Sequence, residues 1–200
     1  MRLILASGSP RRREILRNAG FDFEVRPGSV NEDPLPGEAP ETMVMRLARE
    51  KALQVAADAP SGTIVLGADT TVVVDIEMLA KPLDAADAAR MLRLLSGRAH
   101  TVLTGVCIVE APGRVAASGC ERTEVRFRTL TDSDIRDYVA SGEPFDKAGA
   151  YAVQGRASRF VTRIEGCYFN VMGLPVALVD TLLASEGVVP GSNRRSETIE

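Results

Sequence analysis

Residues 63–75 read TIVLGADTTVVVD, a stretch in which Val, Ile and Thr predominate. Such β-branched residues predict a buried central strand, interrupted at 67–69 where Gly-Ala-Asp stands. A turn at 76–77 is expected to lead the chain back as a hairpin toward residues 78–80. Asp69 is unusual in this setting, because a carboxylate in a buried strand needs a partner, a metal or solvent. The alternative is a bulge at which Asp69 caps a turn.

The segments on either side alternate between helical and extended patterns. Apolar residues at helical spacing predict helices at 11–19, 41–57, 84–95, 131–140 and 175–185. Apolar or alternating runs predict further strands at 3–6, 21–25, 101–110, 115–129, 148–153 and 160–164. Long strands mixed with helices, two of them joined by a tight connection, predict an α/β protein whose mixed sheet is flanked by helices.

Local signals define several boundaries of these elements. Asp84 is a predicted N-cap, and Thr131 with Asp134 three residues later predicts a capping box. Residues 1–186 are expected to form one domain. Residues 187–200 show no periodicity and are expected to form a flexible tail.

The composition is that of an ordinary globular protein, with 45% hydrophobic and 26% charged residues in a chain of 200. A net charge of −3 creates no strong field toward nucleic acid or an anionic membrane, so a phosphate site must rely on local basic residues. No segment approaches the roughly 20 apolar residues of a membrane span. Three widely spaced cysteines argue against a disulfide framework or a structural zinc site and favour the cytoplasm. The single histidine excludes catalysis by a His pair.

Residues 7–12, which read SGSPRR, follow the first predicted strand and open the first predicted helix. Backbone N–H groups at a helix N-terminus bind anions, and the helix dipole adds partial positive charge. Ser9 is placed to cap the helix and to donate to a phosphate oxygen. Arg11 and Arg12 stand at the helix end where cations are disfavoured, which anion binding would explain. An ordinary N-cap with solvated arginines explains the segment equally well.

Other charged residues are candidates for the same site. Lys51 lies in the second predicted helix and Lys81 precedes a proline, and with Arg12 they are candidates to surround a triphosphate. Each lysine taken singly is explained by solvation. Glu32 lies in the loop at 27–40 and is a solvated acid unless it faces Asp69. Two facing carboxylates near a phosphate would favour Mg²⁺ or Mn²⁺, since hard cations take oxygen ligands.

Residues 145–155, which read FDKAGAYAVQG, place charged groups, glycines and an amide in a short span. Gln154 presents donors and an acceptor, a combination suited to the edge of a pyrimidine base. The alternative is a turn followed by a strand with polar ends.

Taken together, these segments resemble the Maf (septum-formation-type) family. The blocks that carry the resemblance follow one another in order over nearly the whole chain. They are LASGSPRR at 5–12, RLAREKA at 46–52, GADT at 67–70, KP at 81–82, LSG at 95–97, DKAGAY at 146–151 and NVMGLP at 170–175. Each block alone is modest evidence, whereas the ordered set is highly specific.

The resemblance implies an elongated mixed sheet related to the inosine-triphosphate pyrophosphatase architecture, with two lobes around a cleft. It also implies hydrolysis of a nucleoside triphosphate to the monophosphate and pyrophosphate with a divalent metal (Mg²⁺, Mn²⁺ or Co²⁺). Asp69 would activate water, and Glu32 would help it at the metal. The phosphate-binding residues would be Ser9, Arg12, Lys51 and Lys81.

One subgroup of the family acts on dTTP and UTP and has Arg, Thr and Gln at three specificity positions, which Arg11, Thr70 and Gln154 match. A 7-methyl-GTP subgroup ranks second, and CTP and modified pyrimidine nucleotides are further candidate substrates. The family is linked to arrest of cell division and to cleansing of nucleotide pools, so a nucleotide-binding regulator with little turnover is an alternative. A nucleic-acid-binding protein is disfavoured by the net charge of −3. A homodimer is expected from the family, and no membrane partner.

Overall fold

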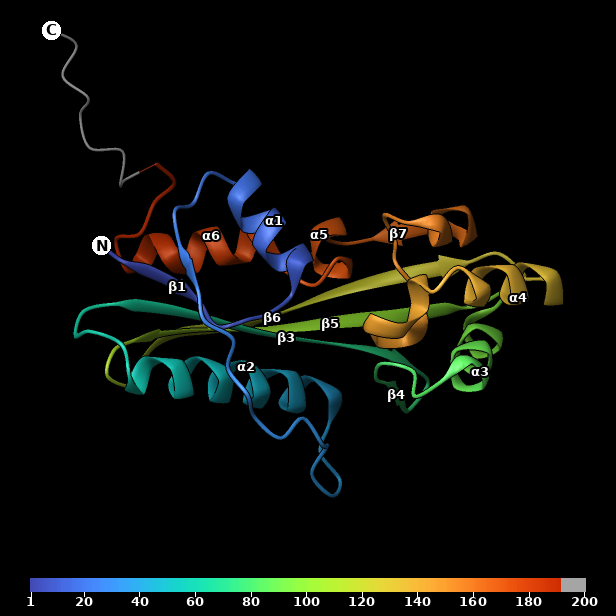
Figure 1. Cartoon of the computed structure of the whole chain (residues 1–200), viewed down its shortest axis with the longest axis horizontal. Coiled ribbons are helices and arrows are strands. Elements are labelled where there is room, and N and C mark those ends of the chain that lie inside the picture. The colour runs from blue at the N-terminus through green and yellow to red at the C-terminus, as the bar shows by residue number, and fades with distance from the viewer. Residues whose placement is uncertain (192–200) are drawn as a thin grey trace, which may run out of the picture. The chain divides into compact units, whose positions relative to one another are not determined.

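The computed structural model describes residues 1–191 of the chain, and its centre is a sheet of seven strands (Figure 1). The strands are β1 (Leu3–Leu5), β2 (Glu24–Val25), β3 (Ile64–Val74), β4 (Glu77–Leu79), β5 (Ala99–Glu110), β6 (Arg114–Phe127) and β7 (Val161–Glu165). They are ordered β2-β1-β3-β5-β6-β7, and β4 also pairs with β3. The α-helices are α1 (Pro10–Asn18), α2 (Pro40–Ala57), α3 (Ala85–Leu95), α4 (Asp132–Ala140), α5 (Tyr168–Val171) and α6 (Val176–Ser185).

The sheet is mixed, as the sequence predicts. β1 is parallel to both β2 and β3, with Leu5 opposite Val25 on one side and Leu66 on the other. β4 is antiparallel to β3, and β7 is antiparallel to β6. The α/β class with a mixed sheet flanked by helices is therefore confirmed. Within the described residues, no helix is both long enough and apolar enough to cross a bilayer.

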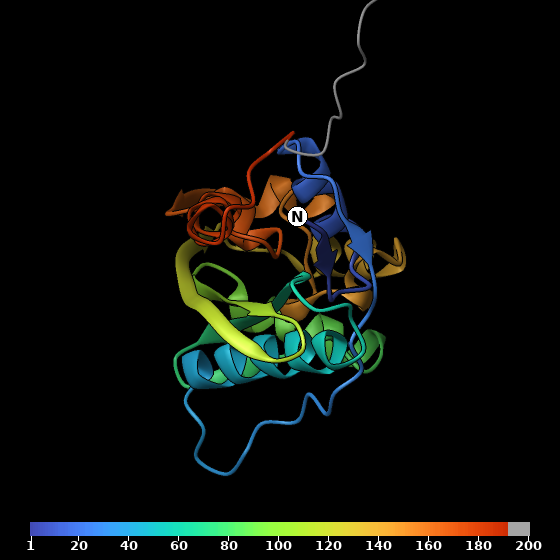
Figure 2. The ribbon, with the colours of Figure 1, turned by 90° about the vertical axis from the view of Figure 1, so that its left-hand side faces the viewer.

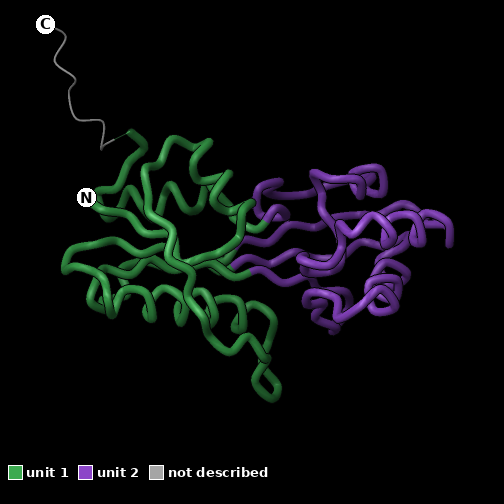
Figure 3. Tube along the Cα trace, viewed as in Figure 1, with its two compact units in different colours: residues 1–69, 105–120, 173–200 green, residues 70–104, 121–172 purple. Residues whose placement is uncertain are grey.

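The chain divides into two compact units (Figure 3). Unit 1 contains residues 1–69 and 105–120 and the segment that begins at 173, and unit 2 contains residues 70–104 and 121–172. In unit 1, α2 covers one face of the strands and α1 and α6 cover the other (Figure 2). In unit 2 the core is aromatic at its centre, where His100, Phe127 and Tyr151 meet edge to face.

Strand β3 corrects one expectation, because Gly67-Ala68-Asp69 does not interrupt it. A Cβ atom on Gly67 would lie 2.1 Å from the carbonyl oxygen of Ala48, and one on Gly105 in β5 would lie 2.4 Å from that of Val44. Both glycines face α2, so the helix backbone approaches two strands at positions without side chains. Gly67 is thus required for close packing and does not break the strand.

Three further expectations differ from the structure. Residues 148–153 are not a strand, because a 3₁₀ turn at Ala148–Ala150 places Gly149 and Ala150 at positive φ. The strand expected at 21–25 is confined to Glu24–Val25. The expected tail is packed at its start, because Val188 is 4% exposed and the N–H of Gly191 donates to the carbonyl of Gly20. Residues 192–200 lie outside the described residues.

Candidate active site

Asp69 lies in β3 just beyond the end of the parallel strand β1. The pairing of β1 with β3 ends at Leu5 opposite Leu66, after which the N–H of Ala6 donates to the carbonyl of Leu66. β3 continues past this point through Asp69, whose side chain is mostly buried, at 8% exposure of the residue. Ligands of open α/β sheets bind outside the carboxyl ends of parallel strands. Asp69 therefore stands where the fold is suited to hold a ligand.

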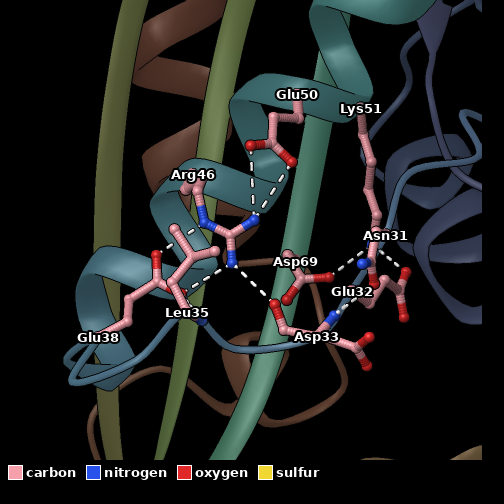
Figure 4. Close-up of polar contacts among 9 residues, drawn as sticks. All are labelled: Asn31, Glu32, Asp33, Leu35, Glu38, Arg46, Glu50, Lys51 and Asp69. Carbon is pink, nitrogen blue, oxygen red and sulfur yellow. Dashed lines mark hydrogen bonds and ion pairs between the residues drawn. The ribbon is translucent and has the colours of Figure 1, made fainter.

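Helix α2 supplies a cation to Asp69. Because Gly67 lets α2 approach β3, Lys51, one turn beyond Ala48, reaches the strand. The Lys51 ammonium lies 2.6 Å from Oδ1 of Asp69 and 2.5 Å from Oε1 of Glu32, and Lys51 is 7% exposed. One ammonium therefore joins the strand acid to the loop acid (Figure 4).

The loop that carries Glu32 is fastened to α2 at both ends. On one side the Gln54 amide forms two hydrogen bonds with the backbone of Ser29. It accepts from the Ser29 N–H at 2.6 Å and donates to the Ser29 carbonyl at 2.9 Å. On the other side Arg46 binds the Glu38 carboxylate at 2.7 and 2.8 Å and the Asp33 carbonyl at 3.2 Å (Figure 4). These contacts hold the loop against α2, so that Glu32 lies beside Lys51.

Helix α1 begins directly after β1. Ser9 is its N-cap, and the Ser9 hydroxyl accepts from the backbone N–H of Arg12 at 3.4 Å. The first turn has no acidic residue and contains Arg11 and Arg12. An N-terminus with this charge is suited to an anion, because the N–H groups and the dipole act in the same direction as the arginines.

The Arg12 guanidinium ties together three segments of unit 1. Its Nε donates to the carbonyl of Gly173 at 2.7 Å, and Nη1 donates to the carbonyl of Ala68 at 2.8 Å and to the hydroxyl of Ser7 at 3.2 Å. Burial lowers the pKa of Arg12 from its ordinary value, and the charge of Asp69 opposes this shift. Arg12 therefore has a structural role beside Asp69, in addition to any role in binding.

The structure brings together some of the residues predicted from sequence. Unit 1 contains Ser9, Arg11, Arg12, Glu32, Lys51 and Asp69, of which Lys51 contacts both acids and Arg12 binds the carbonyl next to Asp69. Unit 2 contains the other three, Thr70, Lys81 and Gln154. The Thr70 hydroxyl lies 2.9 Å from that of Thr104, while Lys81 and Gln154 are exposed.

Several residues that position the site were not predicted. Arg46 and Glu50 form an i,i+4 pair that the sequence does display, but nothing in the sequence links Arg46 to Glu38 and Asp33. Gln54 carries no local signal at all, because its partner Ser29 is 25 residues away.

Comparison with known proteins places this sequence in a family. Residues 2–186 match the sequence model of the Maf-like protein family. A dTTP/UTP pyrophosphatase of Geobacter sp. (strain M21) is 52% identical over 181 residues, 90% of this chain and 93% of the relative. A dTTP/UTP pyrophosphatase of Koribacter versatilis (strain Ellin345) is 51% identical over 189 residues, 94% of this chain and 96% of the relative.

Among solved structures, a nucleoside-triphosphatase / dITP/XTP pyrophosphatase of Mycobacterium abscessus is 18% identical, with a TM-score of 0.39 over 65% of this chain and 76% of the other. A likeness of that size adds no argument. The assignment depends on the match over residues 2–186 and on the two relatives at about half identity. On these grounds the chain belongs to the Maf-like protein family.

Proposed function

We propose that the protein is a nucleoside triphosphate pyrophosphatase that hydrolyses dTTP and UTP to the monophosphate and pyrophosphate. Two relatives at 52% and 51% identity bear the name of this activity. The observation that carries the proposal is the pairing of Asp69 with Lys51 beyond the end of β1, where α1 also begins. An acid, a cation and a helix N-terminus are what phosphate hydrolysis requires of a protein.

The chemistry of Asp69 and Glu32 fits a divalent cation such as Mg²⁺, Mn²⁺ or Co²⁺. Both present carboxylate oxygens, the ligands that hard cations prefer, and Mg²⁺ is usually held by one or two carboxylates together with substrate phosphates. Within residues 1–191, no group of three or more His, Cys, Asp or Glu side chains is placed to hold a metal ion. Asp69 and Glu32 would hold a cation that also binds the substrate phosphates. When bound, the ion supplies positive charge that neutralises the phosphate oxygens.

In the reaction a water oxygen attacks the α-phosphorus and the bond from that phosphorus to the bridging oxygen breaks. Asp69 accepts a proton from the attacking water, and pyrophosphate leaves with the electrons of the broken bond. Lys51, which pairs with Asp69 and Glu32, and the N–H groups of α1 stabilise the charge that develops on the phosphate oxygens. Ser9 and Arg12 hold phosphates from α1, and Lys81 contributes a further charge.

The base is read by Arg11, Thr70 and Gln154. The Gln154 amide has a donor and an acceptor, as a pyrimidine edge requires. The Thr70 hydroxyl is oriented by Thr104 at 2.9 Å. These three assignments support dTTP and UTP over 7-methyl-GTP.

Asp69→Asn tests the proposed chemistry. The variant keeps the size of the side chain but removes its capacity to accept a proton at the attacking water, so kcat for UTP is expected to fall by about 10²–10⁴. Pyrophosphate release is measured with UTP and Mn²⁺, and thermal unfolding confirms that the variant is folded. Near-wild-type turnover would remove Asp69 from this role.

A panel of nucleotides, assayed with Mg²⁺, Mn²⁺ and Co²⁺ in turn, separates the alternatives. Fastest release of pyrophosphate from dTTP and UTP is expected. Fastest release from 7-methyl-GTP would favour the second subgroup, and binding without release would favour a regulator. Light scattering measures the proposed homodimer, and fractionation of cells measures the proposed cytoplasmic location.

A further inference from the structure

The turn that carries Gln154 exposes that residue directly after two buried ones. The N–H of Gly155 donates to the carbonyl of Ala152 at 3.0 Å, which places Val153 and Gln154 at the two central positions. Ala152 and Val153 are each 5% exposed, whereas Gln154 is exposed. The direction of the Gln154 Cα–Cβ bond therefore depends on what holds the two ends of this turn.

Two side chains of unit 2 hold both ends. The backbone N–H of Ala152 donates to the Tyr138 hydroxyl at 3.1 Å, and the N–H of Arg156 donates to Oε2 of Glu143 at 3.1 Å. The two side chains are joined to each other, because the Tyr138 hydroxyl donates to Oε1 of Glu143 at 2.8 Å. The Tyr138–Glu143 pair thus binds the residue that opens the turn and the residue that follows it.

Gly155 shows how closely the carboxylate fits the turn. A Cβ atom on Gly155 would lie 2.3 Å from Oε1 of Glu143 and 2.6 Å from Oε2. A side chain at this position would displace the carboxylate. The glycine after Gln154 is therefore explained by the approach of Glu143.

The hydrogen-bond donors around Glu143 explain why a carboxylate holds the two ends of the turn. Both of its oxygens face donors, the Tyr138 hydroxyl and the Arg156 N–H, and an ionised carboxylate is the side chain that only accepts. Burial, and secondly the hydrogen bond to Glu143, raise the pKa of Tyr138, so its hydroxyl keeps the proton that it donates. An amide at position 143 would either place its N–H₂ group against the Arg156 N–H or turn it toward the Tyr138 hydroxyl, which would then lose the acceptor of its proton.

We propose that Glu143 and Tyr138 are positioning residues that hold the backbone turn presenting Gln154 and thereby set discrimination between pyrimidine bases. This inference rests on the proposed function, in which Gln154 reads the base. Neither residue touches the phosphates in that scheme, so their loss should alter the choice of base more than the rate of bond cleavage.

Glu143→Gln is the test, with kcat and KM measured for UTP and CTP. We expect KM for UTP to rise and the UTP:CTP ratio of kcat/KM to fall about tenfold, the effect of one hydrogen bond lost. We expect kcat for UTP to stay within about twofold. Tyr138→Phe, which leaves the Ala152 N–H without its acceptor, should change the ratio in the same direction. Glu165→Gln, at an exposed carboxylate in β7, is the matched control and should leave the ratio unchanged.

A double variant separates positioning from general destabilisation. If Glu143 acts through Gln154, then Glu143→Gln changes the UTP:CTP ratio in the wild-type background but not in Gln154→Ala. If adding Glu143→Gln to Gln154→Ala lowers the UTP:CTP ratio further, the proposal is overturned. So would an unchanged ratio in both Glu143→Gln and Tyr138→Phe while Gln154→Ala alters it. If Gln154→Ala itself leaves the ratio unchanged, then the role of Gln154 in the proposed function fails instead.

Discussion

Lys51 is a buried cation shared by two carboxylates of different exposure. The Asp69 side chain is 11% exposed, whereas the Glu32 side chain is 54% exposed. Water screens the Glu32 pair, and exposed ion pairs contribute about 0–1 kcal/mol. The pair with Asp69 is shielded, so removing Lys51 breaks the ion pair of a buried carboxylate, which keeps the charge of Arg12 nearby.

Lys51→Met is therefore expected to lower the free energy of unfolding by about 3 kcal/mol, because it breaks the shielded ion pair of Asp69. Glu32→Gln should cost less than about 1 kcal/mol. Urea denaturation at neutral pH measures both. The double variant Lys51→Met, Asp69→Asn should recover part of the loss, and equal effects of the two single variants would contradict the reasoning.

Helix α2 positions Lys51 through a backbone contact with β3. Gly67 and Gly105 are the points at which the helix carbonyls meet the strands, and a methyl group at either point has no space. The distance from α2 to the sheet is fixed by these two residues more than by the aliphatic side chains around them.

Gly67→Ala is expected to destabilise the protein by about 2 kcal/mol, the range of overpacking. It should also lower turnover of UTP, because α2 must shift and Lys51 moves with it. Gly113→Ala is the control, since its Cβ atom would meet only Leu53 Cδ2, at the ordinary distance of 3.9 Å. Chemical denaturation and UTP hydrolysis measure the two effects, and a stable, fully active Gly67→Ala would show that the helix has room to move.

Elements whose signals are local were predictable from the sequence. Asp84 caps α3 by accepting from the N–H of Asp87, and Thr131 with Asp134 forms the expected capping box on α4. Each cap depends on residues within three positions of one another, so the sequence displays it directly.

Elements whose signals are tertiary were not predictable. From the sequence, Gly67 is expected to interrupt a strand, because the Ala48 carbonyl that lies against it is 19 residues away in the chain. Glu32 reads as a solvated acid until Gln54 and Arg46 are known to fasten its loop. The family motifs predicted the candidate residues of the site, but the contacts that support them join positions far apart in the chain and leave no local pattern.

At the scale of the whole molecule, the only histidine is a buried residue of the unit 2 core. His100 is 3% exposed, its Nε2 lies 2.8 Å from the Tyr151 hydroxyl, and burial lowers its pKa to about 3. The unfolded chain therefore binds a proton below about pH 6.5 that the folded chain does not bind. This difference in proton binding lowers the free energy of unfolding as the pH falls below about 6.5, until the folded chain also binds the proton near pH 3.

Between pH 7 and pH 5 the free energy of unfolding should fall by about 2 kcal/mol from His100 alone. His100→Gln does not titrate, so the difference in pH dependence between wild type and variant isolates this contribution. Urea denaturation at the two pH values measures it. Parallel pH curves for the two proteins would show that His100 binds its proton as readily in the folded chain as in the unfolded chain, and would contradict the lowered pKa.

Strand β3 also limits how the length of the chain can change. Successive side chains of a strand face opposite sides, and here Asp69 meets Lys51 of α2 while Thr70 meets Thr104 of β5. One residue gained or lost between Ile64 and Ala68 would exchange the two sides, removing the acid from its cation and carrying Gly67 away from Ala48. At this place an insertion or deletion is more damaging than most single substitutions.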